Sequence, residues 1–185
     1  MSKAYIFLAD GFEEIEALMV VDLLRRADID ITTVAIMGNL TVTGRSNISV
    51  IADCLFEQVD TFADADLLVL PGGMPGTIYL GEHEGLKGLL QEQFAQNKKI
   101  AAICAAPTVF GKMGLLKEKA AACYPGMEEE LYCADAREEA VVVDGNVTTS
   151  RGLGTALEFS LELIRQLKGV DKAEEVAKSV VFLRK

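Results

Sequence analysis

Two short apolar runs without polar alternation place the strongest constraint on how this chain folds. Residues 67–70 read LLVL and residues 100–103 read IAAI, with no polar residue in either run. Residues 4–9, AYIFLA, form a third run of similar length. A strand with one face in water alternates apolar and polar residues, whereas a strand covered on both faces does not. The runs therefore predict central strands of a mostly parallel sheet.

Stretches of helical period lie between these runs, with apolar residues recurring every three to four positions. The expected helices are residues 13–27, 86–97, 106–114 and 155–169, a further strand is 30–36, and two hairpins are 40–53 and 139–152. No internal repeat or low-complexity linker interrupts this alternation. The sequence therefore predicts an α/β sandwich with helices on both faces of the sheet, in a single domain over residues 1–185.

The charge balance bears on partners and location. The chain has 28 Asp and Glu residues against 18 Lys and Arg residues, a net charge of −10. Such a charge repels phosphate backbones and anionic lipid, so neither nucleic acid nor a membrane surface is expected as a partner. The N-terminal residues lack the pattern of a secretory signal, and no apolar stretch approaches the ~18 residues of a membrane span. We expect a cytoplasmic protein.

The cysteines are expected to be free thiols. Cys54, Cys104, Cys123 and Cys133 form no CxxC pair, and no histidine stands at metal-ligand spacing from them. Without an export signal a disulfide framework is not expected. We predict no bound metal, and the reactivity of each thiol becomes the question.

Four turns are expected to meet at one region of the sheet. They are ADGFEE after the first strand, PGGMPG after residues 67–70, CAAP after residues 100–103 and SRGLG after the second hairpin. In a parallel sheet the ligand site lies at the carboxyl ends of the strands. The first three turns therefore share an edge, and the fourth could join them to complete a pocket.

Cys104 stands at an expected strand-to-helix turn. There its sulfur would face the N–H groups and positive dipole of a helix start, which favours the thiolate. Pro107 fits the first turn of that helix, where a missing N–H costs little. Such a turn would expose the sulfur as a nucleophile elbow does. A buried structural cysteine remains the alternative, because free cysteine is among the most buried residue types.

Three acids, Glu13, Glu14 and Glu16, occupy the start of the first expected helix. Carboxylates at a helix N-terminus interact favourably with its dipole and need no other explanation. A carboxyl group close to a thiolate in a dry pocket would nevertheless keep its proton and act as a general acid. Local spacing does not tell which of the three would do so.

The glycine-rich turns do not predict a nucleotide cofactor. PGGMPG could bind an anion through its N–H groups, although a tight turn also needs glycine. Neither it nor residues 152–155 has the spacing of a dinucleotide-binding fingerprint, so we expect no cofactor. His83, the single histidine, lies in a polar segment and is expected to be solvated rather than paired with a cysteine.

The ordered set of motifs resembles the ThiJ/PfpI superfamily, and within it the branch of the Parkinsonism-associated protein deglycase. The motifs are ADGFEEIEA, VVDLLRRA, VLPGGMPG, AAICAAPTVF and TTSRGLGTALEF, which extend over nearly the whole chain. The resemblance implies a flavodoxin-like three-layer sandwich, a homodimer and a reactive cysteine.

The resemblance also assigns roles to individual positions. Cys104 matches the family's reactive cysteine, and Glu16 matches the carboxyl that stays protonated and hydrogen-bonds the sulfur. The remaining matches are Gly73 and Ala105 for the oxyanion-type N–H groups, Gly72, Arg151 and Gly152 for the pocket rim, and Arg26 for the dimer interface.

This chain departs from the family at three places. Ala105 follows Cys104 where the protease-like branch has histidine, so a Cys-His protease dyad loses support. Tyr124 stands on the pocket rim where some deglycase-like members have histidine; it could donate a hydrogen bond but cannot act as a base near neutral pH. Leu153 replaces a common proline. Cys123, next to Tyr124, is a candidate partner for an oxidised Cys104.

Two functions follow as hypotheses from this resemblance. The first is a cofactor-independent glyoxalase or protein deglycase that acts on methylglyoxal, glyoxal and early glycation adducts through Cys104 and Glu16. The second is a redox sensor or stress chaperone that works through oxidation of Cys104. Amidotransferase-like hydrolysis is the weakest alternative, since no base is evident beside the cysteine.

Overall fold

A seven-stranded sheet forms the centre of the molecule in the computed structural model, which describes residues 2–182. The strands lie in the order β10-β11-β7-β6-β1-β2-β5. All neighbouring strands are parallel except β10 and β11, which form an antiparallel hairpin at one edge. Their bounds are β1 (Lys3–Leu8), β2 (Asp30–Ala35), β5 (Cys54–Leu55), β6 (Leu67–Leu70), β7 (Lys99–Ile103), β10 (Val141–Asp144) and β11 (Val147–Ser150).

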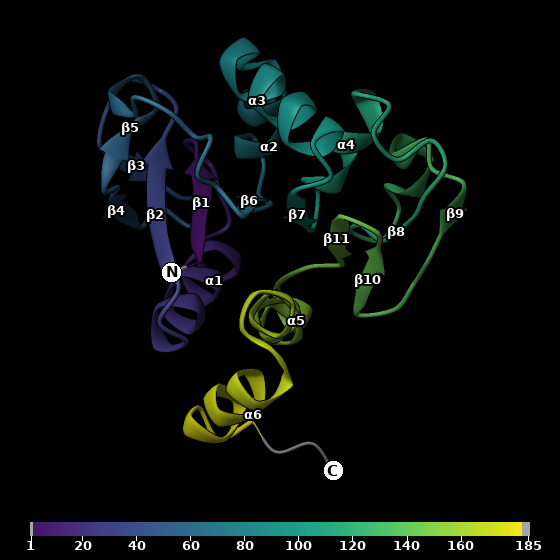
Figure 1. The fold of residues 1–185 in the computed structure, drawn as a ribbon. Coiled ribbons are helices and arrows are strands. Elements are labelled where there is room, and N and C mark those ends of the chain that lie inside the picture. Colours follow the sequence, from purple (N-terminus) through teal and green to yellow (C-terminus); the bar gives the residue numbers. More distant parts are fainter. Residues whose placement is uncertain (1, 183–185) are drawn as a thin grey trace.

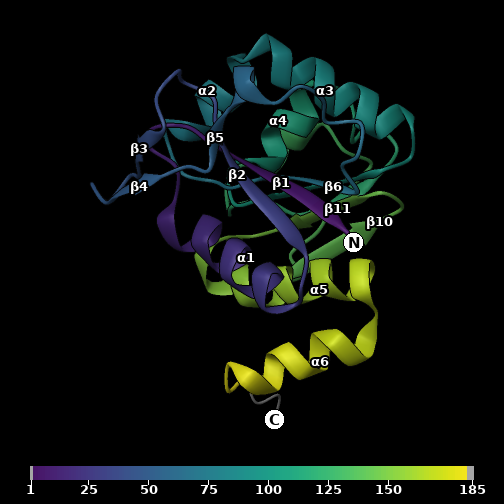
Figure 2. The ribbon, with the colours of Figure 1, turned by 60° about the vertical axis from the view of Figure 1, so that its left-hand side comes forward.

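Helices cover both faces of this sheet (Figures 1 and 2). On one face lie α1 (Glu14–Arg26) and α5 (Ala156–Lys168), with α6 (Val170–Ser179) packed outside α5. On the other face lie α2 (Gly76–Glu82), α3 (Glu84–Ala95) and α4 (Pro107–Lys112). Each helical layer encloses its own apolar core against the strands. The expected flavodoxin-like three-layer sandwich is therefore confirmed.

The central strands are buried as their composition predicts. All four residues of β6 and the apolar residues 100–103 of β7 are buried. Side chains of β6 alternate between the two cores, with Val69 in one and Leu68 in the other. Because both faces of these strands meet apolar helices, an alternating pattern would have placed polar side chains in a core.

Several elements differ from the sequence-based expectation. The helix expected over residues 86–97 is present as α3, which begins two residues earlier and ends at Ala95, whereas α2 before it was not predicted. The two helices separate at His83, whose Nδ1 accepts the Leu86 N–H (3.0 Å) and caps α3. The first hairpin is shorter than expected, with β3 (Thr41–Thr43) and β4 (Ser49–Ile51). A small sheet of β8 (Ala120–Ala121) and β9 (Asp135–Ala136), together with β5, was not predicted.

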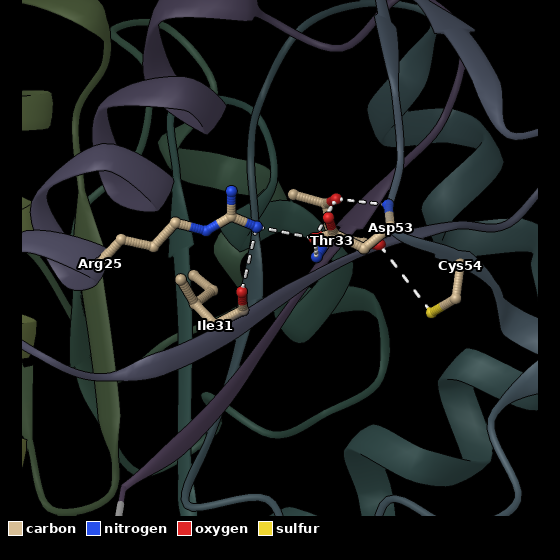
Figure 3. Close-up of polar contacts among 5 residues, drawn as sticks. All are labelled: Arg25, Ile31, Thr33, Asp53 and Cys54. Atoms are coloured by element: carbon tan, nitrogen blue, oxygen red, sulfur yellow. Dashed lines mark hydrogen bonds and ion pairs between the residues drawn. The ribbon is translucent and has the colours of Figure 1, made fainter.

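Asp53 attaches the edge strand β5 to β2 and α1 (Figure 3). Its Oδ2 accepts hydrogen bonds from the Thr33 N–H and hydroxyl, each 2.8 Å long, and from Arg25 Nη2 at 2.8 Å. Arg25 also donates to the Ile31 carbonyl (3.4 Å). Partial burial raises the pKa of Asp53, but the Thr33 hydrogen bonds and the Arg25 charge outweigh it and hold the pKa below its usual range. These side-chain contacts add to the backbone pairing that holds the two-residue strand β5 against β2.

The parallel strands β1, β6, β7 and β11 end at a common edge of the sheet, because each runs in the same direction as its neighbour. The four turns singled out in the sequence follow these ends, so the fourth turn does join the first three. Among residues 2–182, no helix is both long and apolar enough to cross a membrane.

Candidate active site

Cys104 occupies a sharp turn between β7 and α4. Its backbone has φ +66°, a left-handed conformation that residues with a Cβ adopt at a cost. Two hydrogen bonds hold it there: its N–H donates to the Ser150 carbonyl (3.0 Å), and its carbonyl accepts the Tyr124 N–H (2.8 Å). The expected elbow is therefore present, and the side chain is half-buried rather than enclosed in the core.

Glu16 is the acid that reaches the sulfur. Its side chain is 1% exposed, hydrogen-bonds Cys104, and accepts the Gly72 N–H at Oε2 (3.0 Å). Glu13 instead caps α1 by accepting the Glu16 N–H (2.7 Å). Glu14 turns toward the β3–β4 loop and accepts the Ser46 N–H (2.8 Å). The structure thus separates three adjacent acids that local spacing left equivalent.

Gly72 allows Cys104 and Glu16 to approach each other. A Cβ at position 72 would lie 2.5 Å from the Cys104 Cβ and 2.6 Å from Glu16 Oε2. Real Cβ contacts do not occur at such distances, so any larger residue would displace one of the two groups. Gly72 was expected on the pocket rim, but it lies in direct contact with Cys104 and Glu16.

Two backbone N–H groups face the sulfur, one from Ala105 and one from Gly73. Gly73 has φ +94°, and a Cβ there would lie 2.3 Å from the Glu13 nitrogen, so this position needs glycine on both counts. N–H groups aimed at one point favour negative charge there. The arrangement can stabilise a thiolate or an oxyanion formed next to it.

The protons of Glu16 and Cys104 are coupled. Burial raises the pKa of Glu16 to about 7, with a smaller contribution from Glu13 and opposition from the Cys104 and Gly72 hydrogen bonds and from Arg45. Burial and the Glu16 carboxylate raise the pKa of Cys104 to about 12, against the lowering effect of the Ala105 and Gly73 N–H groups. The pair therefore retains at least one proton at neutral pH.

This coupling connects two expectations. The sequence predicted that the turn would favour the thiolate and that a carboxyl close to it would keep its proton. Burial and the Glu16 carboxylate raise the pKa of Cys104 more than the Ala105 and Gly73 N–H groups lower it, so the turn favours the thiolate only together with a protonated Glu16. The thiolate forms when the shared proton resides on Glu16, where the two N–H groups then stabilise the sulfur. Protonation of Glu16 and ionisation of Cys104 therefore occur together.

Tyr124 and Gly152 lie beside this pair. A Cβ placed on Gly152 would lie 3.6 Å from Cδ2 of the Tyr124 ring and 3.8 Å from Glu16 Oε1. Arg151 has a different position: Nη1 donates to the Glu138 carbonyl (3.3 Å), and its charge acts on Cys123. Tyr124 and Gly152 therefore border Cys104 and Glu16, whereas Arg151 contacts the segment that contains Glu138.

Two other predicted positions lie outside the reacting cluster. Arg26, in the last turn of α1, donates from Nε to Asp22 (2.8 Å), and Glu16 lies ten residues earlier in this helix, about 15 Å away along its axis. Cys123 is buried, and its thiol donates to the Tyr124 carbonyl (3.4 Å). Its engagement with Cys104 stays a prediction.

Arg45 is a site residue that the sequence-based reasoning missed. It lies at the tip of the β3–β4 hairpin, where its N–H donates to the Phe12 carbonyl (2.8 Å), and its charge lowers the pKa of Glu16. The sequence marks Gly44 and Arg45 only as a hairpin turn. Nothing local shows that this hairpin packs against the loop before α1. Within residues 2–182, no cluster of three or more His, Cys, Asp or Glu side chains could hold a metal ion.

Comparisons with known proteins agree with this fold. The DJ-1/PfpI family model matches residues 2–166, and the chain belongs to that family. It is 40% identical to Protein dj-1beta of Drosophila melanogaster over 98% of each chain. It is also 40% identical to Protein DJ-1 homolog B of Arabidopsis thaliana, of which it spans only 41%.

Two further comparisons bear on activity and fold. The chain is 30% identical to a Pyrococcus abyssi protein named a deglycase, over 90% of this chain and 99% of that one. The solved structure of oxidized Toxoplasma gondii DJ-1 superposes with a TM-score of 0.93 at 33% identity, covering 98% of each chain. The resemblance inferred from the motifs is therefore confirmed at the level of family and fold.

Proposed function

We propose that the protein is a cofactor-independent glyoxalase that converts small dicarbonyls into hydroxy acids. The observation that carries the proposal is the buried hydrogen bond between Glu16 and Cys104, with the Gly73 and Ala105 N–H groups aimed at the same sulfur. One group can add to a carbonyl, a second can move protons, and two donors can stabilise the oxyanion. These are the requirements of the reaction.

The reaction begins when the Cys104 sulfur adds to the aldehyde carbon of methylglyoxal. A C–S bond forms, the carbonyl electron pair moves to oxygen, and Glu16 supplies the proton that completes a hemithioacetal. The Glu16 carboxylate then transfers the hydrogen of this carbon, as a proton, to the neighbouring ketone carbon through an enediol. One carbon is oxidised and the other reduced, so no external oxidant is needed. Water cleaves the resulting thioester, which releases lactate and restores the thiol.

The same chemistry extends to early glycation adducts on proteins, in which a dicarbonyl has added to a nucleophilic side chain. The half-exposed Cys104 favours access by such adducts. The Pyrococcus abyssi relative named a deglycase is consistent with this extension. Glycated proteins are therefore included among the proposed substrates.

The direct test is lactate formation from methylglyoxal by the purified protein. Cys104→Ser removes the nucleophile and should abolish turnover. Glu16→Gln should also abolish it while the Cys104 thiol remains titratable, because the amide cannot shuttle a proton. Cys123→Ser is the matched control and should retain activity, since that buried thiol is hydrogen-bonded to the Tyr124 carbonyl. Absence of lactate with the wild-type thiol demonstrably reduced would refute the proposal.

A second candidate function is redox sensing at Cys104. The specific observation in its favour is that Glu16 and the two N–H groups would also hydrogen-bond a sulfinate. Hydrogen peroxide oxidises the thiolate to sulfenate and a second equivalent gives sulfinate, with one water released in each step. Peroxide titration followed by peptide mass analysis tests this function. Preferential gain of two oxygen atoms at Cys104 supports it, whereas equal oxidation of all four cysteines argues against it.

We further propose that the chain acts as a single domain and assembles as a cytoplasmic homodimer. One sheet takes its strands from positions 3 to 150, which supports a single unit. Four free thiols fit a reducing compartment. Apolar side chains stand exposed on α1 and the β3–β4 hairpin, and these are Ile15, Leu18, Ile48 and Ile51. A second copy would cover them, with Arg26 near the border of the contact.

A further inference from the structure

The absence of a side chain at Gly152 leaves a small space beside the reacting groups. A Cβ there would contact Tyr124 Cδ2 at 3.6 Å, Glu16 Oε1 at 3.8 Å and Tyr124 Cε2 at 4.0 Å. These are ordinary van der Waals distances, so the position can hold a carbon atom without a clash. The same point is therefore in reach of an aromatic ring and of the proton-transferring carboxyl.

Tyr124 is anchored by its backbone while its ring stays accessible. Its N–H donates to the Cys104 carbonyl (2.8 Å), and its carbonyl accepts the Met127 N–H (3.1 Å). The side chain is nevertheless 52% exposed, so it is not a core residue. A ring that is fixed at its base and open on its surface offers a stacking partner to a bound molecule. Leu153, the residue after Gly152, is likewise 52% exposed.

We infer that Tyr124 and Gly152 form a specificity subsite for the substituent of the dicarbonyl substrate, with a preference for flat apolar substituents such as the aryl group of an arylglyoxal. The inference rests on the proposed function. A dicarbonyl attached to Cys104 must place its second carbon near Glu16, and the space above Gly152 adjoins the Glu16 carboxyl. The substituent on that carbon then extends along the Tyr124 ring. A planar group gains contact with the ring, whereas glyoxal has only hydrogen to place there.

Filling the space at position 152 tests the subsite. Gly152 has φ 163°, extended backbone open to any residue, so Gly152→Ala should fold. We expect this variant to lower the ratio of kcat/KM for phenylglyoxal to kcat/KM for glyoxal at least tenfold, the scale for one methyl group in a pocket. Gly154→Ala is the matched control, because a Cβ there meets no atom within 4 Å. An equal loss for both substrates would overturn the inference.

Substitutions of Tyr124 give a second, independent test of the subsite. Tyr124→Phe keeps the stacking surface and should preserve the preference for phenylglyoxal. Tyr124→Ala removes the ring and should lower kcat/KM for phenylglyoxal about tenfold relative to glyoxal. If Tyr124→Phe loses the preference as fully as Tyr124→Ala, the hydroxyl rather than the ring is responsible and the stacking subsite is wrong.

A readout without turnover separates this inference from the proposed function. A maleimide adds its double bond to the Cys104 thiolate, forming a C–S bond while the adjacent carbon takes a proton. Rates for N-phenylmaleimide and N-methylmaleimide can be followed by mass analysis of the Cys104 peptide. Gly152→Ala should lower the phenyl-to-methyl rate ratio even if no dicarbonyl is turned over. An unchanged ratio in both Gly152→Ala and Tyr124→Ala would refute the subsite whatever the enzymatic result.

Discussion

At the scale of single residues, the state of Glu16 and Cys104 depends on which of the two carries their shared proton. Burial in the folded protein raises the pKa of Glu16 from 4.5 to about 7, so folding favours the protonated carboxyl. Between these two values the folded state binds more protons at this site than the unfolded state, and stability falls as pH rises. The group to which we assign proton transfer therefore lowers the stability of the fold at neutral pH.

Glu16→Gln should remove this cost. Relative to the wild type, the free energy of unfolding of the variant should rise with pH from 4.5 to about 7 by about 3 kcal/mol, and then level off. Urea denaturation across this range measures the difference. The control is Glu129→Gln, which makes the same replacement at an exposed position. A pH-independent difference for Glu16→Gln would mean that Glu16 is ionised in the folded protein as readily as in the unfolded chain.

Gly72→Ala should disrupt the same pair by steric means. The new Cβ would overlap the Cys104 Cβ and Glu16 Oε2. It cannot move away from them, because the Ile103 carbonyl oxygen lies 3.0 Å from it. We expect loss of lactate formation together with destabilisation of about 1–3 kcal/mol, typical of overpacking. Thermal unfolding and turnover are the measurements. Gly88→Ala, in α3 with no atom within 4 Å of its Cβ, should be neutral or slightly stabilising; full activity in Gly72→Ala would contradict the site geometry.

At the scale of elements, sequence patterns predicted what depends on local order and missed what depends on distant contacts. The uninterrupted runs in β6 and β7 are visible because burial on both faces removes polar residues. The elbow at Cys104 follows from the adjacency of strand, cysteine and Pro107. The selection of Glu16 and the contribution of Arg45 depend on how α1 and the β3–β4 hairpin pack, which no short window contains. The two-residue strand β5 has no periodicity to detect.

Because side-chain contacts of Asp53 add to the backbone pairing of β5 with β2, Asp53→Asn should weaken the sheet edge. The amide keeps an oxygen for the Thr33 N–H but loses the charge that pairs with Arg25, so we expect a loss of about 1 kcal/mol at neutral pH. The native pKa of Asp53 is lowered, so its stabilisation is present above the ordinary value of 3.8 and disappears as pH falls below it. Urea titrations at neutral and acidic pH measure this trend.

The control for Asp53→Asn is Asp22→Asn, which breaks an exposed pair with Arg26 four residues away in α1. Such helix-surface pairs contribute about 0.3–0.5 kcal/mol, so the control should cost less. Equal losses in the two variants would show that Asp53 is one more surface ion pair and that β5 is attached by its backbone alone.

At the scale of the whole molecule, exposed apolar side chains stand on two neighbouring elements, α1 and the β3–β4 hairpin. The Gly11 N–H donates to the Thr43 carbonyl (2.7 Å) and the Arg45 N–H to the Phe12 carbonyl, which fixes the hairpin beside the start of α1. Ile51 is 78% exposed on this hairpin. An exposed cluster of this kind in a folded protein marks an interaction surface. A second copy of the chain is the partner that we propose.

Ile51→Glu should therefore convert a dimer into a monomer at micromolar concentration. A carboxylate placed against its symmetry mate in an apolar contact would be both desolvated and repelled. Light scattering coupled to size-exclusion chromatography measures the mass directly. Val143→Glu, on the edge strand β10 and also partly exposed, is the control and should leave the dimer intact. A monomeric wild type, or a dimer that tolerates Ile51→Glu, would exclude this face as the interface, and a dimer lost only in Val143→Glu would move it to the opposite edge of the sheet.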